Sequence, residues 1–82
     1  MEMELRSLLS RMVEDYNTYS QLVAFNNCYG ADDGTIQWNK GCLKSAEDYM
    51  ERLAEILGVK LRYEFSDHGC SFHYLTVKEV IK

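Results

Sequence analysis

The sequence predicts an α+β fold in which two helices precede a C-terminal antiparallel β-hairpin that packs on them. Apolar residues recur at steps of three and four in the first part of the chain and again over residues 46–57. After Gly58 the period changes to two, which is typical of a half-buried strand. With 82 residues, 46% of them hydrophobic, the chain predicts one small domain over residues 1–82.

The N-terminal part of the chain predicts a long amphipathic helix over residues 2–26. Its apolar stripe alternates steps of four and three and consists of Leu5, Leu9, Met12, Tyr16, Tyr19 and Val23. The segment YNTYS, residues 16–20, contains poor helix formers, so a bend or a second helix start is a competing prediction. Asn26 and Asn27, before Gly30, mark the expected end.

An irregular loop is predicted over residues 29–42, YGADDGTIQWNKGC. Its DDGTI resembles the centre of an EF-hand loop, but only Asp33 falls on a ligand position and Lys40 stands where a bidentate glutamate is required. We therefore expect no calcium binding. ADDG predicts a turn, and TIQW is compatible with a short strand. Ile36 and Trp38 are expected to cover one end of the core; the alternative is an exposed Trp38 that anchors a partner.

The second helix is predicted over residues 46–57. Ser45 is its expected N-cap, and Gly58 is the expected C-terminal stop because glycine favours the left-handed conformation there. The apolar stripe of this helix consists of Ala46, Met50, Leu53 and Leu57.

A β-hairpin is predicted after Gly58. Val59, Leu61, Tyr63 and Phe65 alternate with polar residues, SDHG supplies turn residues, and residues 70–77 form the returning strand. If the connection has an even number of residues, Tyr63 and Phe65 share one aromatic face with Phe72 and Tyr74. Leu75 and Val77 then lie on the opposite face, together with Arg62 and His73.

The N-terminal segment and the cysteine content predict an intracellular protein, and the charge bears on its partners. The formal net charge is -4, without a clustered basic face, so we expect no direct binding of nucleic acid. The acidic N-terminal segment differs from a signal peptide, and no apolar run reaches the roughly 20 residues that span a bilayer, so we expect a cytoplasmic protein with no membrane contact. The odd set of three cysteines, Cys28, Cys42 and Cys70, favours free thiols.

No motif supports catalysis or a cofactor. His68, Cys70 and His73 are residue types that zinc prefers, but Cys70 and His73 point to opposite faces of an extended strand. Cys70 as a nucleophile lacks an orienting group, and no phosphate-binding glycine loop follows a strand. We therefore predict a non-enzyme with no bound metal. A zinc-stabilised module remains an alternative, as does a small-molecule-binding domain with its pocket between the aromatic strand face and the first helix.

Acidic residues on the second predicted helix suggest the function. Glu47, Glu51 and Glu55 recur every four residues, and since like charges at this spacing repel, helix stability does not explain them. A solvated face is one interpretation, and a surface for a basic partner is the other. We predict a protein-interaction module, of the size and acidity found in inhibitors and accessory proteins of phages and mobile elements. Its predicted partner-binding residues are Glu47, Asp48, Glu51, Glu55, Trp38 and Tyr29.

Self-association is the last prediction from the sequence. A helix over residues 2–26 would be about 37 Å long, twice the length of the second predicted helix at about 18 Å. The shorter helix cannot cover the longer one, so a two-fold homodimer is expected to bury the remainder. The competing outcome is a break at residues 16–20, after which the helix folds back and the chain is a compact monomer. The predicted dimer interface consists of Leu5, Leu9, Met12 and Tyr16.

Overall fold

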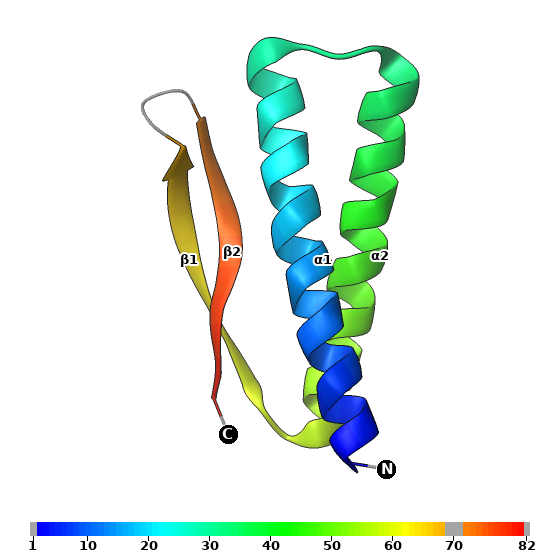
Figure 1. Cartoon of the computed structure of the whole chain (residues 1–82), viewed down its shortest axis with the longest axis vertical. Helices are drawn as coiled ribbons and strands as arrows, with labels where there is room; N and C mark the ends of the chain where they lie inside the picture. Colours follow the sequence, from blue (N-terminus) through cyan, green and yellow to red (C-terminus); the bar gives the residue numbers. More distant parts are fainter. Residues whose placement is uncertain (1, 69–71, 82) are drawn as a thin grey trace.

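The computed structural model describes residues 2–68 and 72–81 and confirms the α+β prediction. Its elements are α1 (Glu2–Tyr29), α2 (Asp33–Leu57), β1 (Lys60–His68) and β2 (Phe72–Ile81). The helices form an antiparallel pair, and the two-stranded antiparallel sheet packs beside α1 (Figure 1). In the upper half of the hairpin, β2 lies between β1 and α1 (Figure 1).

The second helix is twice as long as the sequence predicted. Because α2 begins at Asp33, neither the loop over residues 29–42 nor the short strand at TIQW exists, and Ser45 lies inside the helix rather than at its N-cap. Asp32 is the N-cap residue, and the Thr35 hydroxyl donates a hydrogen bond to its carboxylate. Gly58 ends the helix as predicted, with a positive φ of 69°.

The first turns of α2 were not predicted because a buried asparagine, Asn39, interrupts their apolar pattern. The inward stripe continues through Ile36, Asn39 and Leu43 to Ala46, again at steps of three and four. Asn39 interrupts the apolar pattern, but its amide donates to the Asn26 side-chain oxygen at 2.8 Å inside the helix pair. Asn26 therefore lies within α1, which continues to Tyr29 rather than ending at the asparagines.

The predicted hairpin register is wrong by one residue. Tyr63 pairs with Val77, Phe65 with Leu75, and Ser66 with Tyr74, so Tyr63 and Phe65 share a face with the aliphatic residues rather than with Tyr74. The innermost pair, His68 with Phe72, leaves three residues in the connection, an odd number. An odd count exchanges the faces of the returning strand. The side chains of Phe72 and His73 lie outside the described ones.

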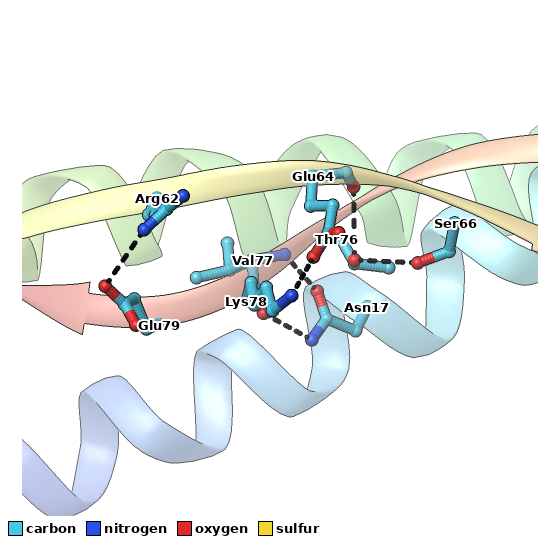
Figure 2. A network of polar contacts seen from close by, with 8 residues as sticks. All are labelled: Asn17, Arg62, Glu64, Ser66, Thr76, Val77, Lys78 and Glu79. Atoms are coloured by element: carbon cyan, nitrogen blue, oxygen red, sulfur yellow. Dashed lines mark hydrogen bonds and ion pairs between the residues drawn. The ribbon is translucent and has the colours of Figure 1, made fainter.

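The YNTYS segment continues α1 without a break and holds the outer edge of β2. Asn17 donates from Nδ2 to the Val77 carbonyl at 3.2 Å and accepts the Val77 N–H on Oδ1 at 2.8 Å (Figure 2). Ser20 donates its hydroxyl to the Leu75 carbonyl at 2.6 Å. These side chains have low helix propensity, but they satisfy strand groups that would otherwise lack a partner in the chain.

The core lies where α1, α2 and the hairpin meet. Its buried apolar residues are Leu9, Tyr16, Ala46, Met50, Leu53, Ala54, Val59 and Val77. The Tyr16 and Tyr63 rings meet edge to face, with centroids 6.0 Å apart. The contact joins α1 to β1, the region in which the sequence alternative placed a ligand pocket.

The fold is thin and leaves much surface open. Its extents are 41 × 26 × 15 Å, and its radius of gyration of 13.6 Å exceeds the about 11.7 Å expected for a compact chain of this length. The accessible surface is 5795 Å², against about 5,100 Å² for a typical protein of this mass. Within the described residues, neither helix is long and apolar enough to cross a membrane.

Candidate functional site, a groove between the two helices

A groove runs between α1 and α2, and we call it the helical groove. It consists of two adjoining hollows, of about 510 and about 300 Å³, which share Met12 and Tyr49 in their walls. On the α1 side it is lined by Leu8, Met12, Asp15 and Tyr19. On the α2 side its main lining residues are Trp38, Cys42, Ser45, Tyr49, Arg52 and Ile56.

Both walls of the helical groove follow the spacing of a coiled-coil seam. The α1 residues are separated by steps of four, three and four, and the α2 residues continue this alternation from Trp38 to Ile56. Each helix therefore has two stripes, one in the core and one along the groove. The sequence signal for the second stripe was present, but the α2 stripe became recognisable only once residues 33–45 proved helical.

Large apolar side chains along the groove are exposed. Trp38 is 70% exposed, Ile56 63% and Tyr49 61%. Trp38 thus does not cover the end of the core as predicted; the alternative, an exposed tryptophan, is what the structure shows. Ile36, its proposed companion, is half-buried.

One polar contact joins the two walls of the groove. A hydrogen bond between the Tyr19 hydroxyl and the Cys42 sulfur raises the pKa of Tyr19 above its ordinary value. Cys42 is a half-buried thiol and Cys28 is an exposed one, whereas Cys70 lies outside the described residues. Asp15 places one carboxylate beside the apolar lining.

The predicted acidic stripe lies between the hairpin and the helical groove. Glu51 accepts a hydrogen bond from Tyr63, and burial, followed by the charges of Glu51 and Glu47, raises the pKa of Tyr63 to about 12. Glu51 also lines, with Asp48 and Glu55, a polar depression of about 520 Å³ that shares Ser45, Tyr49 and Arg52 with the helical groove. The acidic rim therefore borders the groove. Asp48 also forms an exposed ion pair with Lys44 at 3.5 Å.

The remaining predicted site residues do not join the groove as a set. Tyr29 is exposed at the end of α1, where its ring packs on Phe25 with centroids 4.8 Å apart. Of the predicted dimer residues, Leu9 and Tyr16 are each 3% exposed, in the core of their own chain. The length argument for that interface is wrong because α2, at 25 residues, covers most of α1, at 28. Leu5 and Met12 are half-buried.

No group of three or more potential metal ligands gathers within the part of the chain that the structure describes. The zinc prediction concerned Cys70 and the side chains of His68 and His73, which lie outside that part. Asp33, the one EF-hand ligand position that the sequence satisfied, is in the first turn of α2. We expect calcium titration to leave the melting temperature unchanged.

Comparisons with protein-family models, with curated proteins and with solved structures find no match to this chain. Any functional conclusion therefore depends on the helical groove and the surfaces around it.

Proposed function

We propose that this protein is a non-enzymatic interaction module that binds an amphipathic helix of another protein in the helical groove. The observation that carries the proposal is the coiled-coil spacing of exposed and half-buried residues along both walls. A third helix laid between two such stripes would insert its own apolar residues at the same spacing. Trp38 and Tyr49 are residue types that anchor interfaces, since a large ring is buried at low entropic cost.

Charge supports a partner with basic flanks. Asp15 lies in the groove, and Asp48 and Glu55 lie along its rim, with Arg52 as the basic exception. Lysine or arginine beside the apolar stripe of a bound helix would face these carboxylates. Such pairs at an exposed rim contribute mainly to association rate and to the choice of partner.

The single tryptophan makes the proposal testable, because Trp38 lies in the groove and reports its occupancy by fluorescence. A display library of random 20-residue peptides is selected against the protein. We expect the enriched peptides to share apolar residues at steps of three and four with basic flanks, and to shift the Trp38 emission. Enriched peptides without this pattern, or without an effect on Trp38, would contradict the proposal.

Matched variants distinguish binding in the groove from nonspecific binding to exposed apolar side chains. Tyr49→Glu places a charge in the groove wall and should weaken the selected peptides at least tenfold, or about 1.4 kcal/mol. Phe65→Ser is the control, because Phe65 is 73% exposed, comparable to Trp38, but is on β1 away from the groove. Equal loss of binding in both variants would show that the peptides do not use the groove.

The cellular setting belongs to the same proposal. An intracellular, cytoplasmic location is supported by the odd number of cysteines, which favours free thiols, and a role in phages or mobile elements only by size and charge. A native mass spectrum of the purified protein tests the competing functions. Added metal mass would favour a zinc-stabilised module, and retained ligand mass a small-molecule-binding domain.

A further inference from the structure

The outer edge of β1 has a regular row of backbone groups that point away from β2. In an antiparallel pair, two residues opposite each other either exchange both hydrogen bonds or direct both sets outward. Val77 directs its N–H and C=O to Asn17, so its partner Tyr63 must also direct its own groups outward. The Leu75 carbonyl, bonded to Ser20, implies the same for Phe65.

The two edges of the sheet therefore differ in whether their backbone groups have partners. α1 covers the edge of β2 through Asn17 and Ser20. Within the described residues, no backbone bond joins the outward groups of Tyr63 or Phe65 to another part of the chain. The bulge between Arg62 and Tyr63 places its extra residue, Lys78, in β2. β1 thus remains a regular strand, suited to pairing with another strand.

The sequence of β1 is complementary to itself when read antiparallel. With Tyr63 opposite the partner's Tyr63, the segment LRYEF places Leu61 opposite the partner's Phe65 and Arg62 opposite the partner's Glu64. Two-fold symmetry makes each of these pairs occur twice. Tyr63 directs its backbone groups outward, as a hydrogen-bonded pair at the centre requires.

Side chains on the solvent face extend this match across four strands. Within one chain, Arg62 Nη1 forms an ion pair with Glu79 Oε1 at 3.5 Å, and Lys78 Nζ forms one with Glu64 Oε2 at 2.9 Å (Figure 2). Pairing Arg62 with the partner's Glu64 would join these ion pairs into rows of alternating sign. Moving the two-fold axis by one residue in either direction would instead place Glu64 on Glu64 or Arg62 on Arg62, which repel.

Exposed aromatic surface on the other face favours the same register. Phe65 is 73% exposed, although it shares the face of Leu61, which packs against the core. In this register Phe65 lies beside the partner's Leu61 and extends the partner's apolar surface. One pairing thus covers the backbone edge, the charges and the phenylalanine together.

We propose that two copies of this chain join through β1, antiparallel and with Tyr63 on the two-fold axis, to form a four-stranded sheet in the order β2-β1-β1-β2. The surface is separate from the helical groove, so each copy keeps its groove open. It also differs from the interface that the sequence predicted on α1. A contact made by one short strand from each copy buries little surface, so we expect weak association.

The test uses two charge variants that are designed to associate only with each other. Arg62→Glu places a second carboxylate opposite the partner's Glu64, and Glu64→Arg places a second guanidinium opposite the partner's Arg62, so each variant alone repels its own copy twice. When the two are mixed, both rows have opposite charges again. Repulsion within each chain, toward Glu79 or Lys78, is the same alone and mixed, so mixing isolates the contact between chains.

Sedimentation equilibrium from about 10 µM to about 1 mM covers the affinities expected of a small interface. We expect the unaltered chain to approach twice the monomer mass, each variant to stay monomeric, and the equimolar mixture to dimerise. Circular dichroism of each variant checks that it folds. A monomeric unaltered chain at the highest concentration would overturn the proposal, and so would variants that dimerise alone or a mixture that does not associate.

The two proposals fail separately. Tyr49→Glu should abolish peptide binding in the groove and leave the dimer intact, whereas Arg62→Glu should abolish the dimer and leave peptide binding intact. A single variant that removes both properties would show that one surface serves both, and it would overturn the β1 pairing.

Discussion

Replacing Asn17 by aspartate tests how the hairpin is attached to the helices. The asparagine amide both donates to and accepts from Val77, at 3.2 and 2.8 Å, as a neighbouring strand would. Aspartate has nearly the same shape and can still accept the Val77 N–H. It loses the donor, however, and directs a carboxylate oxygen at the Val77 carbonyl oxygen.

The expected cost follows from these two contacts. A hydrogen bond of this kind contributes about 1 kcal/mol, and an unsatisfied, partly buried carbonyl adds about 1 kcal/mol more. The free energy of unfolding of Asn17→Asp should therefore fall by about 2 kcal/mol at pH 7, or about 12 °C in melting temperature for a chain of this length. Asn17→Ala, which loses both bonds without adding a charge, is the matched control. Chemical denaturation followed by circular dichroism measures both variants.

The pH dependence distinguishes this mechanism from a general loss of packing. Proximity to the carbonyl oxygen and partial burial raise the pKa of the new carboxyl in the folded state above its unfolded value. The folded state then binds a proton first as the pH falls, so the deficit of Asn17→Asp should shrink between pH 7 and pH 4. The deficit of Asn17→Ala should change much less. A pH-independent deficit in Asn17→Asp would refute the proposed contact with Val77.

Three further predictions concern the core, two glycines, in α2 and at its C-cap, and the hairpin. Met50 is 0% exposed, so Met50→Ala should lower the free energy of unfolding by about 3 kcal/mol in urea titration, whereas Ile56→Ala should cost under about 1 kcal/mol. Gly41→Ala adds a Cβ to open space inside α2 and should stabilise by about 0.5–1 kcal/mol, but Gly58→Ala, at φ 69°, should destabilise by about 1 kcal/mol. The pKa of Tyr63 is raised to about 12, so the unfolded state ionises first and stability should fall above pH 10, less steeply in Tyr63→Phe. Equal alkaline slopes in the two proteins would contradict that assignment.

The sequence predicted the element types well where one rule applied alone. The apolar stripe of α1 and the two-residue period after Gly58 are local patterns, and both appear in the structure. The start of α2 was missed because glycines and β-branched residues have low helix propensity, and because Asn39 looks like a break in an apolar stripe. Only its long-range partner, Asn26, makes it a core residue.

The register and the groove depended on facts that no single segment contains. Whether the connection between β1 and β2 has an odd or an even number of residues decides which face of β2 meets the helices. Turn-forming residues in the sequence do not give that number. The groove needed both helices at full length before Trp38 and Met12 were recognised as parts of one surface. The acidic stripe was visible in the sequence, but its position between the hairpin and the groove rim was not.

The buried hydrogen bond between Asn26 and Asn39 also restricts how the two helices can slide. If α2 moved one turn, about 5.4 Å, along α1, the two buried amides would lose each other as hydrogen-bond partners, which is costly. Apolar stripes alone would tolerate such a slip, because leucine and methionine pack in more than one alignment. The asparagine pair thus selects one alignment of the helices. That alignment sets Tyr19 across from Cys42, and with it the shape that the groove presents to any helix that enters it.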